Sequence, residues 1–392
     1  MQNEVYILSG IRTPIGTFGG SLATTSPIDL GTLVTSNAIE KANLYPNQIG
    51  HVAFGHVINT EPRDMYLSRV ISINSKIPET TPAFNVNRLC GSGAQAIVSM
   101  YQTIFLGDTD FAVAGGSENM SLSPYIVKNS RWGKKMGNVL IEDMMLGALN
   151  CPFGTGHMGV TAENVAKKYN ISREEQDQFA LTSQKKALNA LKNNHFEDQT
   201  ISIDISNKKE KKIFKKDEHL KETSLDNLSK LKPVFVKDGT VTAGNSSGLN
   251  DGAAAIVLGS KKATLENNLN PVARIIGYAH SGVDPMIMGI GPITAVKKLC
   301  EKTSLKINDF DVIESNEAFA AQACAVNKAL DINHELVNPN GGAIALGHPI
   351  GATGTILVIK AISELKRLQK KLGLITMCIG GGQGIAIAIE NL

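Results

Sequence analysis

The sequence contains few aromatic residues and almost no net charge. Aromatic residues make up only 5% of the 392 residues, and the formal net charge is +3. Proteins that bind nucleic acid usually present a basic surface and aromatic side chains on which bases stack. The composition therefore argues against a nucleic-acid partner, whereas a small anionic substrate remains compatible with it.

Cysteine patterns typical of disulfide frameworks and metal sites are also missing. The five cysteines form an odd set without any C-x-x-C pair, namely Cys90, Cys151, Cys300, Cys324 and Cys378. Such a set argues against a disulfide framework and against a zinc site. We therefore expect free thiols in a reducing compartment and no bound metal.

The sequence has no segment that would attach the chain to a membrane. No apolar run reaches the length needed to span a bilayer. Residues 1–8 have no basic stretch before their apolar run, which predicts a strand and not a signal peptide. The final residues, Glu390-Asn391-Leu392, differ from the peroxisomal signal Ser-Lys-Leu. We expect a soluble cytoplasmic protein that makes no membrane contact.

Apolar strand-like runs alternate with stretches of helical periodicity, and this alternation predicts an α/β fold. In the first half we expect strands over residues 5–9, 52–57, 83–86, 111–114 and 253–258, with helices over 28–42, 64–74 and 91–106. In the second half we expect strands over 273–279, 311–314, 374–378 and 385–389 and a short one near Leu336, with helices over 293–302, 318–330 and 352–368. Because the two orders match, we predict two similar halves.

An insertion of a different composition interrupts the first half at about residues 120–250. Ser172 and Glu175 form a capping box that predicts a helix over 171–191. The lysine-rich run at 208–216 is typical of a solvated face, although it could also attract a phosphate-bearing ligand. We expect a first half (1–120 plus 251–268), a loop domain that forms a lid (121–250) and a second half (269–392).

Cys90 lies in the motif Cys90-Gly91-Ser92-Gly93, where a predicted strand leads into a predicted helix. Unpaired N–H groups at a helix start favour a thiolate, so we expect a nucleophilic cysteine with a lowered pKa. The two glycines would let a ligand approach the backbone. The alternative is a buried structural cysteine, which is the usual fate of a free thiol.

Three further motifs fall at the carboxyl end of the predicted sheet, where ligands of such sheets bind. His348 in Gly347-His348-Pro349 could accept the proton of a thiol, and Cys378 before a glycine run could act as a base. Asn316 could bind a water or an oxyanion. The ordinary alternatives are an exposed loop histidine, a core cysteine and a helix N-cap.

Together, the segments 86–93, 316–320, 341–354 and 378–384 resemble the motifs of the thiolase family, in the family's order and over nearly the whole chain. The resemblance implies a thiolase-like fold in which two βαβαβαββ halves form a five-layered α-β-α-β-α core. It also implies that Cys90 carries the acyl group, that His348 activates Cys90, and that Cys378 exchanges a proton with the second substrate. Asn316 would act through a water, and the N–H groups of Cys90 and Gly380 would form an oxyanion hole.

The same resemblance implies an acyltransferase of fatty acid metabolism that condenses two acyl-CoA molecules reversibly, with acetyl-CoA and 3-ketoacyl-CoA as substrates and no cofactor. The contacts to CoA and to the acyl group are expected from His157, Met158, Phe235, Ala243, Ser247, Met288 and Phe319. Lys221 stands where the family often has an arginine for the adenine end. The family is usually homotetrameric, as a dimer of dimers.

Several alternatives remain open at this stage. The segment 156–159 resembles short-chain, acetoacetyl-forming enzymes, whereas 60–66 and 143–145 resemble broader 3-ketoacyl-CoA thiolases, including those of β-oxidation. A related ketosynthase would have a histidine in the place of Cys378, and a non-catalytic lipid carrier would be expected to lack Cys90. A NAD-dependent oxidoreductase would need a G-x-G-x-x-G motif after its first strand, and this chain has none there.

Overall fold

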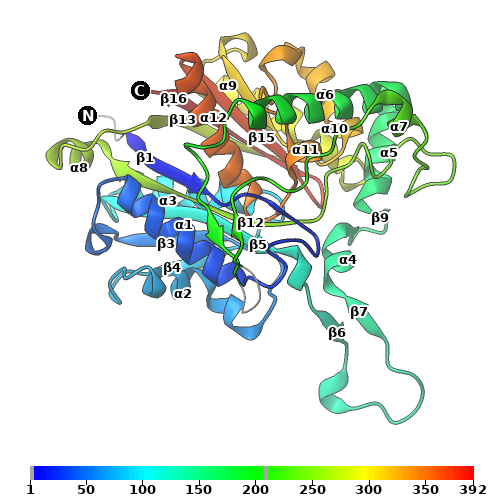
Figure 1. Cartoon of the computed structure of the whole chain (residues 1–392), viewed down its shortest axis with the longest axis horizontal. Coiled ribbons are helices and arrows are strands. Elements are labelled where there is room, and N and C mark those ends of the chain that lie inside the picture. Colours follow the sequence, from blue (N-terminus) through cyan, green and yellow to red (C-terminus); the bar gives the residue numbers. More distant parts are fainter. Residues whose placement is uncertain (1–3, 207–210) are drawn as a thin grey trace.

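The computed structural model describes residues 4–206 and 211–392 (Figure 1). Lys208 and Lys209 of the lysine-rich run lie outside these residues. None of the helices in the described part of the chain is long and apolar enough to cross a membrane.

The first half forms a five-stranded sheet in the order β4-β3-β5-β12-β1, to which the short β2 (Gly16–Thr17) adds at β12. Its strands are β1 (Val5–Arg12), β3 (His51–Gly55), β4 (Ala83–Val86), β5 (Phe111–Asn119) and β12 (Asn250–Ser260). The three helices are α1 (Pro27–Lys41), α2 (Leu67–Asn74) and α3 (Ser92–Leu106). The α/β alternation predicted for this half is confirmed.

The second half repeats this plan in the order β14-β15-β16-β13. Its strands are β13 (Ala273–Gly282), β14 (Val312–Ser315), β15 (Leu372–Ile379) and β16 (Gln383–Asn391), and its main helices are α9 (Gly291–Thr303), α10 (Ala320–Leu330) and α12 (Thr353–Leu368). The strand expected near Leu336 is wrong. His334–Leu336 is a 3-10 turn, and only Val337 bridges to Ile313, because Asn338 adopts a left-handed φ of 44° that ends the extended backbone.

The two half sheets meet where β1 and β13 pair over Tyr6–Arg274 and Ile7–Ala273, which makes one ten-stranded sheet. Helices α3 and α12 pack against each other between the half sheets, while α1 and α2 cover the outer face of the first and α9 covers that of the second (Figure 1). This layering agrees with the expected thiolase-like fold. With helices on both faces, β5 and β12 are buried along almost their whole length.

Strand β5 is longer than predicted, because Gly115-Gly116-Ser117-Glu118-Asn119 also pairs with β12 although it lacks an apolar pattern. Ser117, Glu118 and Asn119 are all fully buried there. Sequence reasoning therefore missed a polar, buried strand end that lies beside the second half.

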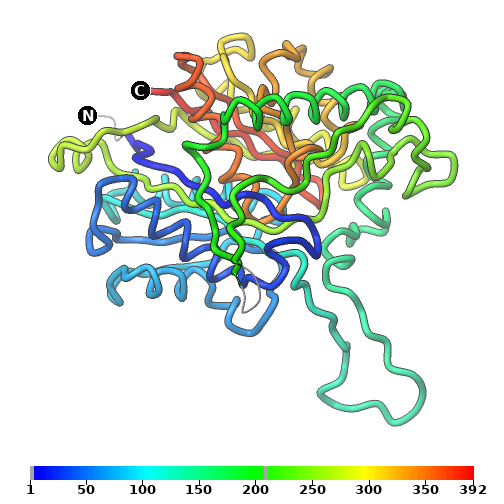
Figure 2. Tube along the Cα trace, viewed as in Figure 1, coloured from blue at the N-terminus to red at the C-terminus, as the bar shows by residue number. Residues whose placement is uncertain are grey.

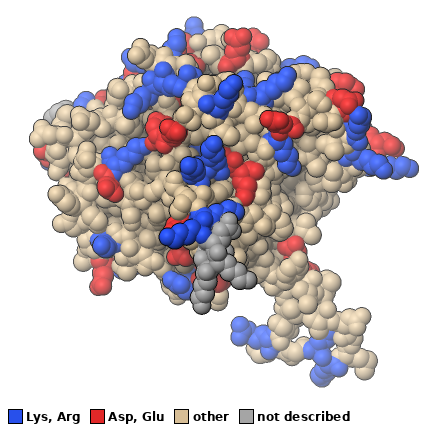
Figure 3. Space-filling model, in the orientation of Figure 1, with Lys and Arg blue, Asp and Glu red and all other residues tan. Residues whose placement is uncertain are grey.

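The insertion has two parts of different shape. An arm made of β6 (Tyr125–Val127), β7 (Ile141–Asp143) and α4 (Met144–Leu149) projects from the molecule (Figure 2), and Lys and Arg side chains gather on it (Figure 3). A compact part contains β8 (Asn150–Cys151), β9 (Gly156–His157), α5 (Met158–Tyr169), α6 (Arg173–Lys192) and α7 (Leu225–Ser229). Ser172 caps α6 by accepting the N–H of Glu175, as predicted. The domain boundaries given above stay a prediction.

A buried ion pair fastens the insertion to the first half. Arg12, which is fully buried in β1, donates to both carboxylate oxygens of Asp217 at 2.7 and 2.9 Å and to Gln199 at 2.9 Å. Such bidentate pairs are strong and directional, and they also satisfy the hydrogen-bonding needs of both charges. The segment of the insertion around Asp217 is therefore held in one position against β1.

Candidate active site

Cys90 lies in the tight turn between β4 and α3. Leu89 has a left-handed φ of 45°, which a leucine rarely adopts. The buried hydroxyl of Ser92 holds this turn by accepting the N–H of Arg88 at 2.8 Å and donating to the carbonyl of Leu89 at 2.6 Å. Cys90 is thereby presented two positions before the helix begins at Ser92.

The expected lowering of the pKa of Cys90 is wrong. Burial raises the pKa of this thiol to about 11, although the N–H groups of Gly380 and of Cys90 itself act in the opposite direction. The rise in the pKa of Cys90 caused by desolvation is therefore larger than the decrease caused by the N–H groups near the helix start. Cys90 is a neutral thiol at rest and must lose its proton during any reaction that uses it as a nucleophile.

Gly380 reaches Cys90 from the second half. β15 ends at Ile379, and a glycine turn leads into β16. The two turns touch so closely that a Cβ on Gly91 would lie 2.5 Å from Ile379 Cδ1. The N–H groups of Gly380 and Cys90 both point to the Cys90 sulfur, so two backbone donors converge where a thioester on Cys90 would form.

Cys378, one residue before the end of β15, is only 1% exposed. Burial, followed by the nearby charge of Cys90, raises the pKa of the Cys378 thiol far above its ordinary value. Cys378 also packs in one apolar cluster with Met158, Met288 and Phe319. The structure thus brings together two sulfurs that lie far apart in the sequence, as predicted.

The imidazole of His348 has a defined proton position. Nδ1 lies 2.7 Å from Oγ1 of Thr353, and that hydroxyl already donates its only hydrogen to the carbonyl of Pro349 at 2.9 Å. Nδ1 must therefore donate, which leaves the lone pair on Nε2. Burial lowers the pKa of His348 to about 4, so the ring is neutral at physiological pH and able to accept a proton.

The backbone around His348 is held as firmly as the ring. The N–H of His348 donates to Oδ1 of Asn250 at 2.9 Å. Gly347 before it has a φ of +109°, and a Cβ there would lie 2.5 Å from the Asn250 carboxamide. Only glycine fits this left-handed turn, so the fixed backbone predicted from the motif is confirmed.

Asn316 follows β14 and lies 3.3 Å from His348, measured from Nδ2 to Nε2. It is not a helix N-cap, because α10 begins at Ala320 and is preceded by Phe319. Its Oδ1 is buried without a hydrogen-bond partner among the described residues. A buried orphan acceptor of this kind is a natural place for a water or a substrate N–H.

Cys90, His348 and Gly380 line an apolar cavity of about 60 Å³, whereas Cys378 and Asn316 are not part of its lining. The predicted residues in its lining are Cys90, Met158, Ser247, Met288, Phe319, His348 and Gly380. The residues that were not predicted are Leu89, Ala148, Leu149, Ala318 and Ile350. Ile350 follows the His348 motif and could have been suspected from it. Ala148 and Leu149 come from α4 at the base of the arm, and no local sequence signal marks them.

An aromatic stack adjoins the cavity. The rings of His157 and Phe235 are stacked with centroids 4.6 Å apart, and Phe235 meets Phe319 edge to face at 6.1 Å. His157 is fixed because its Nδ1 accepts the N–H of Gly159 at the start of α5. The three predicted residues thus form one rigid apolar wall.

Like His157 and Phe235, the predicted contact residues Ala243 and Lys221 lie outside the cavity lining. Ala243 is exposed on the loop before Ser247. The side chain of Lys221 is also exposed, and its N–H donates to Gln184 at 2.9 Å. Both lie on the insertion side of the site, so they can only contact a ligand that extends out of the cavity.

The chain is similar to known proteins over its whole length. The chain matches the models of the thiolase N-terminal domain over residues 5–262 and of the thiolase C-terminal domain over 269–391. It is 54% identical to the β-ketothiolase BktB of Cupriavidus necator and 43% identical to an acetyl-CoA acetyltransferase of Syntrophomonas wolfei, each over 100% of both chains.

Solved structures agree with these matches. The acetyl-CoA acetyltransferase of Bacillus anthracis superimposes with a TM-score of 0.98 at 43% identity, over 100% of this chain and 99% of that chain. Human mitochondrial 3-ketoacyl-CoA thiolase superimposes with a TM-score of 0.98 at 41% identity over 100% of both. A further structure of the human enzyme contains CoA and gives a TM-score of 0.97 at 41% identity, over 100% of this chain and 98% of that chain.

Proposed function

The chain belongs to the thiolase family of acyltransferases, and we propose that it joins two acyl-CoA molecules in a reversible Claisen condensation through an acyl group carried on Cys90. In the opposite direction the enzyme cleaves a 3-ketoacyl-CoA with CoA. The observation that carries this proposal is the meeting of Cys90, His348 and Gly380 at one apolar cavity. CoA thioesters are the substrates, and no cofactor takes part.

In the first half-reaction, Cys90 passes its proton to Nε2 of His348, and its sulfur attacks the thioester carbonyl of acetyl-CoA. The N–H groups of Cys90 and Gly380 stabilise the oxyanion. The bond from the acetyl carbon to the CoA sulfur then breaks. The leaving CoA thiolate takes the proton of Cys378, so the enzyme is left with acetyl-Cys90, a Cys378 thiolate and a protonated His348.

In the second half-reaction, the Cys378 thiolate removes a proton from the methyl group of a second acetyl-CoA. A thiol of high pKa gives a strong base, which suits a weak carbon acid. His348 and a water on Asn316 stabilise the enolate oxygen, and the enolate carbon attacks acetyl-Cys90. The bond to Cys90 breaks, His348 returns its proton to Cys90, and all three groups regain their starting states.

The narrow cavity favours short acyl groups. Leu149, Met158 and Ile350 line the cavity together with Cys90, and its volume is about 60 Å³. We therefore propose acetoacetyl-CoA as a preferred thiolysis substrate. A broader 3-ketoacyl-CoA thiolase is the second candidate, which the 54% identity to the Cupriavidus necator β-ketothiolase favours. Thiolysis rates with 3-ketoacyl-CoA of four, five, six and eight acyl carbons decide between them: equal kcat/KM at all four lengths would contradict the short-chain preference.

For the rest of the CoA molecule we propose the route past the aromatic stack. The His157–Phe235 wall and Ser247 would contact the pantetheine, Ala243 would lie further along it, and Lys221 would reach the adenine end. The exposure of Ala243 and Lys221 outside the cavity supports this order. A lysine offers a point charge and no planar stacking surface, so its contribution should be salt-sensitive.

We also propose that the chain assembles as a homotetramer. Trp132, Met136 and Leu140 on the arm are 86%, 88% and 71% exposed, and such a patch usually marks an association site. Phe84 on the edge strand β4 is 40% exposed, which supports a second contact. Light scattering should give four times the chain mass for the wild type and a smaller assembly for Trp132→Ser/Leu140→Ser. A wild-type monomer would refute the proposal.

A cytoplasmic location and a role in fatty acid metabolism complete the proposal. All five cysteines are free, as expected for a reducing compartment. CoA thioesters of short 3-keto acids are also substrates of fatty acid chemistry.

The central test of the proposal is covalent labelling. Brief incubation with labelled acetyl-CoA should place one acetyl group per chain on Cys90, located by mass spectrometry of peptides. Cys90→Ala should take up no label. Label on another thiol, or none in an active enzyme, would refute the assignment of Cys90 as the nucleophile.

A further inference from the structure

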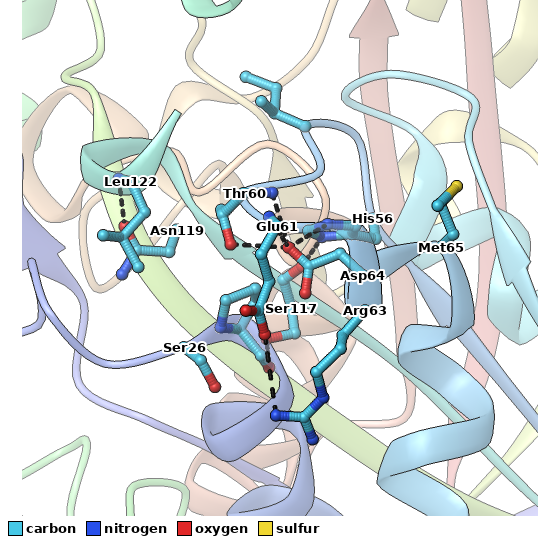
Figure 4. A network of polar contacts seen from close by, with 12 residues as sticks. Ser26, His56, Thr60, Glu61, Arg63, Asp64, Met65, Ser117, Asn119 and Leu122 are labelled. Carbon is cyan, nitrogen blue, oxygen red and sulfur yellow. Dashed lines mark hydrogen bonds and ion pairs between the residues drawn. The ribbon is translucent and has the colours of Figure 1, made fainter. Parts of the chain in front are cut away.

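Three ionisable side chains lie buried beside the active site and take no part in the steps above. They are Asp64 in the 3-10 helix η2 (Pro62–Tyr66), His56 directly after β3, and Glu118 in β5. Their exposed fractions are 0%, 3% and 0%. Figure 4 shows His56 beside Asp64 and Ser117. Burying three such groups is costly unless they are paired, so their arrangement calls for a physical reason.

His56 lies between the two carboxylates. Its Nδ1 is 2.8 Å from the carbonyl of Ser117 and must carry a hydrogen, because a carbonyl only accepts. Nδ1 is also 3.5 Å from Oε1 of Glu118, and Nε2 is 3.7 Å from Oδ2 of Asp64. Burial opposes a charge on His56, but Glu118 and Asp64 outweigh burial and raise its pKa.

Glu118 connects the two halves of the molecule. Its Oε2 accepts the N–H groups of Val57 at 3.0 Å and Gly351 at 2.9 Å, and its Oε1 accepts the N–H of Ile58 at 3.1 Å. All three partners donate, so both oxygens must accept, as they do in an ionised carboxylate. Gly351 lies three positions after His348. Glu118 therefore ties the loop that carries His348 to the loop after β3.

The charge of Glu118 depends on His56. Burial raises the pKa of Glu118, and His56 is the largest influence in the opposite direction. Glu118 is also close enough to Cys90 for its charge to raise the pKa of that thiol. A proton on Glu118 would leave the N–H groups of Gly351 and Val57 competing for a weaker acceptor, and the His348 loop would loosen.

We propose that His56 is a positioning residue for the reaction: paired with Asp64, it keeps Glu118 as the anion that holds the His348 loop beside Cys90. The proposal rests on the roles proposed above for Cys90 and His348. The charged groups that face His56 are Glu118 and Asp64. Arg63, the neighbour of Asp64 in the chain, is exposed and lies 3.8 Å from Glu61 instead (Figure 4).

The test is the pH dependence of His56→Gln. At pH ~6.5 its kcat for thiolysis of acetoacetyl-CoA should be about 100-fold below wild type, the loss expected for a misplaced catalytic group, with little change in KM. Without the positive charge of His56, the pKa of Glu118 rises further, so a larger fraction of Glu118 carries a proton. Raising the pH to ~9 favours the ionised form of Glu118, and the ratio of variant to wild-type kcat should rise towards one. A ratio that is the same at every pH indicates a merely structural role and overturns the proposal.

Two further variants make the test specific. Glu118→Gln should lose activity at every pH, and His56→Gln/Glu118→Gln should lose no more than Glu118→Gln, because His56 acts through Glu118. Losses that multiply in the double variant would overturn the proposal. The matched control is His51→Gln at the start of β3, the strand that precedes His56, and it should leave kcat at its wild-type value.

A second route covers the case in which His56→Gln does not fold. Asp64→Asn retains His56 and Glu118 but makes a positive charge on His56 less favourable. Its kcat should be about 10-fold below wild type near neutral pH and should recover at high pH. A ratio of variant to wild-type kcat that does not change with pH overturns the proposal. Acetylation of Cys90 in the wild type is measured in parallel: its absence would refute the proposed function, whereas normal labelling with flat ratios would refute only the role of His56.

Discussion

Strands β5 and β15 occupy equivalent places in the two half sheets but end in different ways. β5 lies between β12 and β3, and β15 lies between β16 and β14. Glu118 in β5 pairs with Gly252 near the start of β12, and Cys378 in β15 pairs with Gly384 near the start of β16. The same position in the repeated fold therefore holds a carboxylate in one half and a thiol in the other.

The connections that follow these strands explain the difference. β15 passes directly into β16 through a glycine turn, so Gly380 and Cys378 both reach Cys90. β5 is separated from β12 by the whole insertion, which supplies Leu149 and Met158 to the cavity instead. The two similar halves therefore have different roles. The second half supplies Cys378 and Gly380 for proton transfer, whereas the first half anchors loops through Glu118 and supplies pocket residues through the insertion.

The strongest test of this comparison is removal of the thiol of β15. Cys378→Ala should still be acetylated at Cys90, although more slowly because the leaving CoA thiolate loses its proton donor, whereas condensation should fall by about 10⁴-fold because the carbon acid loses its base. Rapid-quench measurement of acetyl transfer and of acetoacetyl-CoA formation separates the two steps. Condensation at a normal rate would mean that another group is the base.

The control for this variant is another buried cysteine of the same apolar cluster. Cys324 lies on α10 and is 5% exposed, and it belongs with Cys378 to the cluster that backs the cavity. Cys324→Ala removes a similar volume without touching the reacting groups. It should keep wild-type condensation and lose only a little stability, about 1 kcal/mol.

The glycine turn can be tested through Gly380→Pro, which removes the N–H that points to Cys90. Loss of one oxyanion donor should lower the rate of Cys90 acetylation by about 100-fold. Gly380→Ala keeps the N–H and is the matched control, because its Cβ would meet only the ends of two flexible side chains, 3.0 Å from Leu89 Cδ1 and 3.3 Å from Met158 Cε. Equal rates for the two variants would contradict the oxyanion role.

The protonation of Cys90 should appear in its alkylation rate. Because its pKa is raised to about 11, the thiolate fraction of the free enzyme grows about tenfold per pH unit below that value. Inactivation by iodoacetamide should therefore accelerate by about 100-fold from pH ~7 to pH ~9, without a plateau. A rate that is already constant near neutral pH would indicate a preformed thiolate–imidazolium pair and contradict the neutral resting state.

The smallest effect is expected where His348 is oriented. Thr353→Val removes the hydroxyl that accepts from Nδ1, so the ring can take the other tautomer and kcat should fall by about 10-fold, the value of one hydrogen bond. Thr353→Ser retains the hydroxyl and should stay close to wild type. If the two variants lose the same activity, packing and not proton position is responsible.

Local patterns in the sequence predicted most of the fold. The strands and helices around Cys90 and Cys378 begin or end within a few residues of their predicted limits, because apolar periodicity reflects the faces that are buried. The pattern failed at the polar end of β5 and near Leu336. Ser117 and Glu118 form a strand through pairing with β12, whereas Asn338 interrupts one through its left-handed backbone.

The candidate site was predictable only where a motif marks it. Cys90, His348 and Cys378 lie in unusual glycine-rich surroundings, and these surroundings distinguish them from the other cysteines and histidines of the chain. Leu149 lies in an ordinary apolar helix and becomes a pocket residue only because α4, at the base of the arm, packs beside the segments that carry Cys90 and His348. The raised pKa of Cys90 could not be predicted from the sequence either, because it depends on burial by segments that are distant in the chain.

By itself, the sequence determined which residues carry reactive groups and where the chain alternates between strand and helix, because both are properties of neighbouring residues. The tertiary structure decided which groups meet: it set Gly380 against Cys90, placed the lone pair of His348 on Nε2, and enclosed His56 between Asp64 and Glu118. Protonation and hydrogen bonding depend on distance and on the loss of water, and these are set when segments remote in sequence pack together.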